Sequence, residues 1–259
     1  MKKYFLLIPI FVFLIASSIV FYYKFDQNLL TKLSFYVNLA NPYMRIVRVE
    51  EGMRKEEVAE MVADKLDWDQ NKINSFINGG GNVEGHLFPK TYLIYKDDDP
   101  STVRATMVNE FSNNLSKVNK PKSKKIINEE TALKIASIVQ REAAGKSDMP
   151  IVSGVIWNRI FNGMKLQIDA TLQYAKGNGE DGWWTRVTPE DKDISSSYNT
   201  YKVAGLPPGA IANPGMDAIN AAYNPAKTSC LFYLHDKHRR IHCAKTYEEH
   251  KRNIEIYLK

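Results

Sequence analysis

The feature that most constrains the fold is an uncharged apolar run near the N-terminus. From Phe5 to Tyr23 the chain carries no charged residue, and Lys2 and Lys3 precede the run. At a rise of about 1.5 Å per residue, a helix of this length just crosses the roughly 30 Å hydrocarbon core of a bilayer. The run therefore predicts a single membrane span, and the positive-inside rule places the rest of the chain outside the cytoplasm.

A cleaved signal peptide is the alternative interpretation of this run. Residues 16–18, Ala-Ser-Ser, form a weak small-residue cleavage site after the apolar stretch. The aromatic residues at 21–23 favour a retained anchor, because such side chains gather at the membrane interface. Both interpretations export the C-terminal bulk of the chain. The predicted organisation therefore begins with an anchor over residues 1–24 and a linker over residues 25–45.

Charge and composition exclude other classes of protein. The chain has 35 Lys and Arg residues against 29 Asp and Glu, a formal net charge of +6 over 259 residues. Two of these charges, Lys2 and Lys3, precede the apolar run, and the others are spread without a basic stripe. Nucleic acid is not expected as a partner, since its binding proteins concentrate Lys and Arg on one face. The 44% of apolar and 25% of charged residues are typical of globular domains.

A small module is predicted over residues 46–80. Residues 45–50 alternate like a strand, and Gly52 closes a turn. Two helical patterns follow, the first over residues 54–66 and the second ending at the glycines 79–81. This order resembles a LysM-like α/β module.

The rest of the chain, residues 81–259, is predicted to be a mixed catalytic domain rich in helices and loops, so that the whole chain is α+β. Helices are expected over residues 100–115, from Asn128 to residue 144, over 150–162 and over 213–223. Pro100 suits the first position of its helix, and Asn128 suits a helix cap.

Two cysteines flank a predicted hairpin near the C-terminus. Cys230 and Cys243 enclose two strand-like runs around a polar turn. They form either a disulfide or two half-buried thiols, and the sequence does not decide between them. The absence of a CxxC pair argues against structural zinc. The histidines His235, His238 and His242 are more consistent with a solvated hairpin than with a metal site.

Glu142 is the strongest candidate for chemistry. In the helix that Asn128 begins, Glu142 lies four residues after Ile138 and so continues the apolar stripe. A carboxyl in this position is poorly solvated, which raises its pKa and keeps it protonated near neutral pH, as a general acid requires. The alternative is a helix-end carboxylate that turns outward and pairs with Arg141 or Lys146.

Three polar loops supply candidate ligand groups. If residues 163–171 are extended, Gln167, Asp169 and Thr171 lie on one side and offer an amide, a carboxylate and a hydroxyl to sugar hydroxyls. A polar edge strand is the alternative. The loops at 84–92 and 197–209 combine aromatic and polar side chains with Gly and Pro, and an ordinary surface loop is the alternative for both.

Five motifs, in order along the chain, resemble those of the YceG-like family of endolytic murein transglycosylases. They are EGHLFPKTY at 84–92, IASIVQREA at 135–143, NRIFNGMKLQIDAT at 158–171, YNTY with GLPPG and NPG between 198 and 215, and NPAKT with LFYL between 224 and 234. The resemblance covers residues 84–234, and the LysM-like pattern extends it back to about residue 46.

The resemblance implies a lytic transglycosylase that cleaves the bond between MurNAc and GlcNAc and closes a 1,6-anhydro ring on MurNAc. It implies Glu142 as the catalytic acid and base, because Glu142 matches the family's helix motif. Gln140 replaces the first Glu of that motif, so only Glu142 remains there as a candidate acid. Neither a cofactor nor a metal is implied. The predicted substrate-binding residues are Glu84, Gln167, Asp169, Thr171, Tyr198 and Asn199.

The implied partners are peptidoglycan glycan strands and the inner (cytoplasmic) membrane, with peptidoglycan synthases as further candidates. A single-pass protein with its catalytic domain on the periplasmic side would cut nascent strands and end their elongation. Two other functions stay open. One is a non-catalytic peptidoglycan-binding anchor, and the other is a hydrolase that uses Asp169 or Glu84 as a second carboxylate.

Overall fold

The structure, a computed structural model, describes residue 17 and residues 40–120, 127–179 and 182–259. The predicted anchor, except for Ser17, and most of the predicted linker lie outside these residues. Within the described ranges, no helix is both long and apolar enough to cross a membrane. The described part is α+β, as predicted, with mostly helical structure and two small antiparallel sheets.

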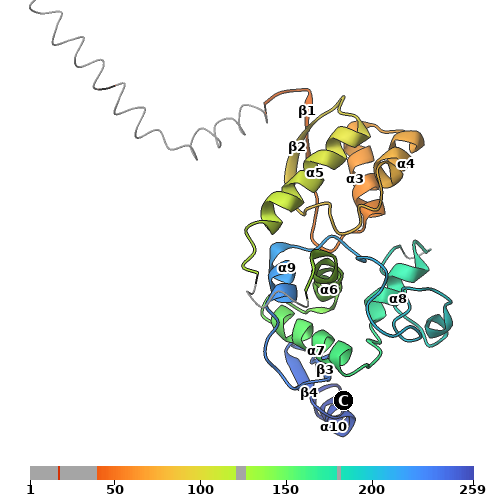
Figure 1. Ribbon diagram of the computed structural model, residues 1–259. Coiled ribbons are helices and arrows are strands. Elements are labelled where there is room, and N and C mark those ends of the chain that lie inside the picture. Colours follow the sequence, from red (N-terminus) through yellow and green to blue (C-terminus); the bar gives the residue numbers. More distant parts are fainter. Residues whose placement is uncertain (1–16, 18–39, 121–126, 180–181) are drawn as a thin grey trace, which may run out of the picture.

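The N-terminal unit packs three helices on a two-stranded sheet (Figure 1). Strand β1 (Met44–Arg48) pairs antiparallel with β2 (Thr91–Tyr95). The helices are α3 (Lys55–Leu66), α4 (Gln70–Asn78) and α5 (Pro100–Leu115). Their common core includes Val47, Val58, Phe76, Tyr92 and Met107, all of which are buried.

This unit is larger than the module predicted over residues 46–80. The partner of β1 is β2, more than forty residues later, and the core continues to Met107 in α5. The predicted boundary at residue 80 therefore falls inside one packed unit. The helices within it agree with the patterns, since α3 ends at Leu66 and α4 ends before the glycines at 79–81.

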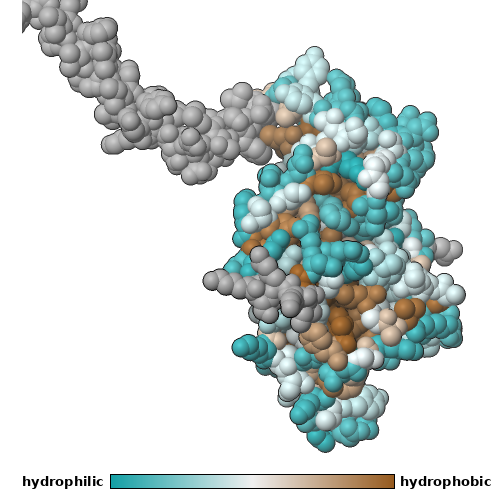
Figure 2. Space-filling model, viewed as in Figure 1, coloured by the Kyte–Doolittle hydropathy of each residue, from teal (hydrophilic) through white to brown (hydrophobic). Residues whose placement is uncertain are grey.

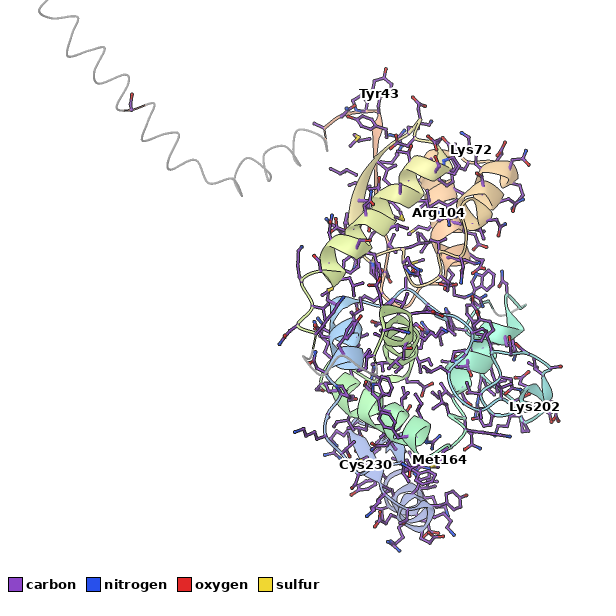
Figure 3. All side chains as sticks on the ribbon, viewed as in Figure 1. Tyr43, Lys72, Arg104, Met164, Lys202 and Cys230 are labelled. Atoms are coloured by element: carbon purple, nitrogen blue, oxygen red, sulfur yellow. A yellow bond between two sulfur atoms is a disulfide. The ribbon has the colours of Figure 1, made fainter. Side chains whose placement is uncertain are left out.

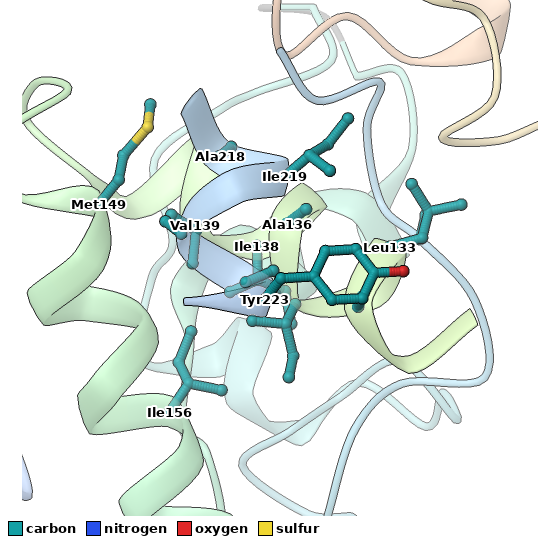
Figure 4. Close-up of a cluster of buried hydrophobic side chains, with 14 of the residues drawn as sticks. Leu133, Ala136, Ile138, Val139, Met149, Ile156, Ala218, Ile219 and Tyr223 are labelled. Atoms are coloured by element: carbon teal, nitrogen blue, oxygen red, sulfur yellow. The ribbon is translucent and has the colours of Figure 1, made fainter. Parts of the chain in front are cut away.

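Three mutually packed helices form the core of the second unit. Helix α6 (Glu129–Glu142) contacts both α7 (Met149–Phe161) and α9 (Met216–Tyr223), which also contact each other. Their apolar side chains interdigitate in the cluster of Figure 4. Asn128 caps α6 as predicted, because its Oδ1 accepts a hydrogen bond from the Thr131 backbone N–H at 2.7 Å.

A hairpin and a terminal helix form the end of the molecule that lies farthest from β1 in Figure 1. Strands β3 (Phe232–His235) and β4 (Ile241–Ala244) pair antiparallel, and α10 (Tyr247–Tyr257) packs against them. A disulfide joins Cys230 to Cys243, whose Cα atoms are 5.8 Å apart. The hairpin is confirmed, and of the two states left open for the cysteines the structure has the disulfide.

Residues 163–171 do not form one extended strand, which was the condition for a row of Gln167, Asp169 and Thr171. Gln167 has a positive φ of 51°, which interrupts the run, and Asp169 begins helix α8 (Asp169–Lys176). The Ile168 carbonyl accepts hydrogen bonds from the Thr171 backbone N–H at 3.2 Å and from its hydroxyl at 2.7 Å, which starts the helix. Gln167, Asp169 and Thr171 therefore do not form one row. A short 3-10 helix, η1 (Glu190–Asp193), contacts α8.

Glu84 joins the two units. Its side chain accepts hydrogen bonds from the Lys55 backbone N–H, at the start of α3, and from the Tyr174 hydroxyl of α8, both at 3.2 Å. Glu84 is only 1% exposed. Burial and the nearby Glu56 carboxylate raise the pKa of Glu84 to about 8, against the opposing charge of Arg54.

This raised pKa predicts a pH-dependent stability. Below an ordinary pKa of 4.5, Glu84 is protonated in both the folded and the unfolded chain. Between there and a pH of about 8, the unfolded chain releases a proton that the folded chain keeps, so the free energy of unfolding falls as pH rises. We expect the free energy of unfolding of the Glu84→Gln variant to fall less than that of the wild type over this pH range, by about 1.4 kcal/mol per pH unit.

Urea unfolding at the two ends of this range measures the difference. Glu60→Gln is the matched control, because Glu60 is an exposed residue of α3. It should keep the wild-type dependence on pH. Equal pH dependence of the wild type and Glu84→Gln would show that the buried carboxyl titrates normally.

Candidate active site

Glu142 is the last residue of α6, and as a whole residue it is half-buried. The apolar stripe that leads to it is closed to solvent, with Ile135, Ile138 and Val139 all 0% exposed. The Tyr233 hydroxyl, from β3, donates a hydrogen bond of 2.6 Å to Glu142 Oε2. The C-terminal hairpin thus reaches back to the end of the central helix.

The neighbouring basic residues are engaged elsewhere. Lys146 forms an ion pair of 2.6 Å with Asp217. The Arg141 guanidinium lies 3.7 Å from the centre of the Trp184 ring. The alternative of an outward-turned Glu142 held by one of these side chains does not describe this structure.

Burial raises the pKa of Glu142, as expected from the sequence. The hydrogen bonds from the Tyr233 hydroxyl and the Ala170 backbone N–H oppose this shift, and the nearby Asp169 carboxylate adds to it. Burial likewise raises the pKa of Tyr233, so its hydroxyl keeps the proton that it donates. Glu142 is therefore poised to hold a proton at a pH where ordinary carboxyls have lost theirs.

Glu142 opens onto a cavity of about 470 Å³. Its walls come from α6, α7, the loop before α8 and the start of α8, η1 and the loop after it, β3 and α10. The lining residues are Glu142, Val155, Ile156, Arg159, Leu166, Gln167, Ile168, Asp169, Lys192, Tyr201, Phe232, Tyr233, Tyr247 and His250. The cavity thus combines a protonatable carboxyl with polar, cationic and aromatic groups, as expected of a site for a polar ligand.

Gln167 and Asp169 line this cavity together with Glu142, as their prediction as substrate-binding residues requires. The Tyr201 hydroxyl donates a hydrogen bond of 2.5 Å to Asp169 Oδ1 and orients that carboxylate. Burial, and then this hydrogen bond, raise the pKa of Tyr201. Lys192 Nζ lies 4.9 Å from the centre of the Tyr201 ring, so a cation borders the same wall.

Arg159 joins two walls of the cavity. Its Nε donates a hydrogen bond of 2.6 Å to the Leu231 carbonyl, just before β3, and its Nη1 donates to the Leu166 carbonyl, in the loop after α7. In Figure 3, Cys230 and Met164 mark these two segments. A half-buried guanidinium that binds two carbonyls fixes the spacing of the segments that carry Tyr233 and Gln167.

Thr171, Tyr198 and Asn199 do not line the cavity. Thr171 and Asn199 are fully buried. The Asn199 side-chain amide donates to the carbonyls of Lys192 at 3.0 Å and Ile194 at 2.8 Å. The Tyr198 ring packs on Tyr174, with 4.7 Å between ring centres. These contacts hold the loop that carries Tyr201 and Lys192. The three residues therefore stabilise the cavity wall without lining the cavity.

Glu84 also lies outside the cavity lining, in the contact between the two units. Conversely, Arg159, Tyr201 and Tyr233 contribute to the cavity although the sequence did not single them out. All three fall within the motifs quoted above, so a signal was present. The motifs do not show which side chains of a loop face the cavity, because that depends on tertiary packing.

A second cavity, of about 620 Å³, lies beside α7 and is more apolar. It includes Trp157 and Phe161, whose rings stack with 5.5 Å between their centres, and Phe161 is 64% exposed. Figure 2 shows hydrophobic residues gathering at the level of α7 on the visible face. Among the described residues, the lining of this second cavity contains no carboxylate, so the cavity lacks an acid for catalysis.

Two of the three hairpin histidines, His235 and His242, are each paired with a carboxylate. His235 Nε2 lies 3.1 Å from Asp148 Oδ2, and His242 Nε2 lies 3.0 Å from Asp236 Oδ2. In the part of the chain that the structure describes, no three His, Cys, Asp or Glu side chains are grouped so that they could hold a metal ion.

Comparison with known proteins places this geometry in a family. The model of the YceG-like family matches residues 22–256. A Bacillus subtilis (strain 168) protein named endolytic murein transglycosylase is 31% identical over 245 residues, covering 85% of this chain and 67% of that protein. A Streptococcus pneumoniae (serotype 2, strain D39) protein of the same name is 32% identical over 174 residues, covering 66% of this chain. The chain spans about a third of the length of that relative, 32%.

A solved structure has the same fold. The crystal structure of a yceG-like protein from Listeria monocytogenes, at 2.6 Å resolution, superposes with a TM-score of 0.70 and 26% sequence identity. The match covers 82% of this chain and 76% of that one. The family model, the relatives and the solved structure agree, and this chain belongs to the YceG-like family.

Proposed function

We propose that the protein is an endolytic lytic transglycosylase, which cleaves the MurNAc–GlcNAc bond of peptidoglycan and leaves a 1,6-anhydro-MurNAc end. The observation that carries the proposal is a carboxyl of raised pKa, Glu142, in a polar and aromatic cavity. The relatives named endolytic murein transglycosylases support the substrate and the reaction.

In the first step, protonated Glu142 acts as the general acid. It donates its proton to the glycosidic oxygen as the bond from that oxygen to MurNAc C1 breaks, so the GlcNAc leaving group departs with a hydroxyl. Tyr233 binds Glu142 Oε2, which leaves the other carboxyl oxygen for the transferred proton. The raised pKa of Glu142 keeps this proton available at a higher pH than an ordinary glutamate would.

In the second step, the Glu142 carboxylate acts as the base. It takes the proton of the MurNAc C6 hydroxyl while O6 attacks C1 and closes the anhydro ring. The carboxyl regains its proton, so the cycle is balanced without water. The Tyr233 hydrogen bond stabilises the carboxylate between the two steps.

Asp169 lines the same cavity, so it is the candidate second carboxylate if the protein is a hydrolase. In the transglycosylase its negative charge would stabilise positive charge that develops at C1 as the bond breaks. In a hydrolase it would activate water or attack C1. Only Asp169 of the two proposed second carboxylates serves this alternative, because Glu84 lies outside the cavity lining.

We also propose that the protein is anchored in the cytoplasmic membrane by its N-terminal apolar run and acts on its outer side. The uncharged residues 5–23, behind two lysines, support this location. An anchored cavity would meet glycan strands as they emerge, so cleavage would end their elongation. Peptidoglycan synthases are the partners that such a position suggests.

We expect the Glu142→Gln variant to lose activity on purified sacculi by about a hundred-fold or more, because the amide cannot donate or accept the proton. The Gln side chain keeps the size of the Glu and its hydrogen-bonding with Tyr233, so the fold should persist. Mass spectrometry of the released fragments measures both rate and product. The wild type should release 1,6-anhydro-MurNAc ends.

Glu130→Gln is the matched control on the same helix, since Glu130 is an exposed residue in the first turn of α6. It should digest sacculi like the wild type. Full activity of Glu142→Gln would remove Glu142 from the mechanism. Reducing MurNAc ends in the wild-type digest would make the protein a hydrolase.

We expect the Tyr233→Phe variant to move the alkaline limb of the pH–rate profile to higher pH. The Tyr233 hydroxyl stabilises the charged Glu142 carboxylate, so its loss raises the pKa of Glu142 further. The acid then stays protonated to a higher pH. Initial rates across the active pH range, compared with those of Tyr95→Phe on the exposed edge of β2, measure the shift. A limb that stays in place or moves to lower pH would contradict this role.

A further inference from the structure

We propose that Tyr247 and Phe232 form a stacking platform for a sugar ring of the glycan strand, next to the reaction centre. The inference rests on the proposed function and adds a binding site to it. Both residues line the same cavity as Glu142. They come from α10 and β3, which the sequence did not connect with substrate binding.

Tyr247 is an aromatic side chain that the fold covers only in part, with Lys251 Nζ 5.2 Å from the centre of its ring. It is 55% exposed although it borders a cavity, whereas most aromatic residues of the second unit are buried or half-buried. An exposed ring at the edge of a pocket loses apolar hydration when a ligand covers it. A sugar ring has an apolar face of C–H groups, which suits such a surface.

Phe232 and His250 support the ring of Tyr247. The ring centres of Phe232 and Tyr247 are 5.8 Å apart, with 52° between the planes. His250 stacks on Phe232 at 5.5 Å and 23°. The Arg159 guanidinium lies 5.2 Å from the centre of the Phe232 ring. The platform is thus a packed aromatic group and not a single loose side chain.

The backbone beneath the platform is also fixed. Tyr247 is the first residue of α10, and Thr246 caps that helix in a capping box with Glu249. The helix packs on the hairpin that the disulfide between Cys230 and Cys243 ties together. A ring presented from such a support loses little conformational freedom on binding, which favours affinity.

The cavity lining thus combines two chemically different sets of side chains. One set is the carboxyls of Glu142 and Asp169, and the other is the aromatic platform. A polymer that contacts both sets gains binding energy from a ring that does not react. The platform therefore selects for strands that continue past the cleaved bond, which is the requirement for cutting a strand internally.

The test measures binding separately from catalysis. In full-length protein carrying Glu142→Gln, calorimetry gives the Kd for peptide-free strands of alternating GlcNAc and MurNAc. We expect Tyr247→Ala to raise this Kd about ten-fold and Tyr247→Phe to change it by less than about two-fold, since Phe keeps the ring face. Tyr257→Ala, on the same helix but outside the cavity lining, should bind like the parent.

In the active protein, Tyr247→Ala should raise KM for long strands and leave kcat unchanged. Unchanged Kd in Tyr247→Ala, with the parent binding strands, would overturn the platform and leave the proposed function intact. A ten-fold loss in Tyr247→Phe as well would also overturn it, because the hydroxyl and not the ring would then bind. Failure of the Glu142→Gln parent to bind strands would overturn the proposed substrate and the platform together.

Discussion

The hydrogen bond between the Tyr233 hydroxyl and Glu142 Oε2 is the interaction on which the site depends. It joins the end of the central helix to the C-terminal hairpin, two segments separated by about ninety residues. Helix α6 is held between α7 and α9, so the position of Glu142 is set by the core. Arg159, near the end of α7, then ties the loop after α7 to the segment before β3. The cavity exists because these three segments are tied to one another.

Several residues of the sequence motifs form hydrogen bonds to backbone groups and hold segments of the chain together, and they do not line the cavity. Asn213 is fully buried, and its side chain accepts a hydrogen bond from the Leu87 N–H at 2.9 Å and donates one to the Met53 carbonyl at 2.9 Å. It thereby holds the N-terminal unit against the second one, as Glu84 does through α3 and α8. Asn199 does the same for the loop that carries Tyr201. Short sequence motifs in this chain therefore mark both the cavity and the contacts that shape it.

Sequence patterns predicted the features that depend on nearby residues, such as helix positions and helix caps. The apolar stripe and the Asn128 cap specified α6 and placed Glu142 at its end, and Pro100 marked the start of α5. The pairing of β1 with β2 was missed, since no local signal links strands more than forty residues apart. The start of α8 was missed because residues 163–171 fit an alternating pattern, while the turn at Gln167 depends on a hydrogen bond to the distant Thr200 carbonyl. Tyr233 and Arg159 were missed for the same reason, because tertiary packing decides which side chains of a motif face the cavity.

The central claim is that burial at the end of α6 keeps Glu142 protonated where an ordinary glutamate is ionised. Carbon-13 NMR of protein labelled at the Glu carboxyl carbons measures this directly, with the signal of Glu142 assigned by its loss in Glu142→Gln. The account predicts a titration midpoint above the ordinary glutamate value of 4.5. A midpoint at or below that value would contradict the account, because Glu142 would then lack the proton that the first step requires.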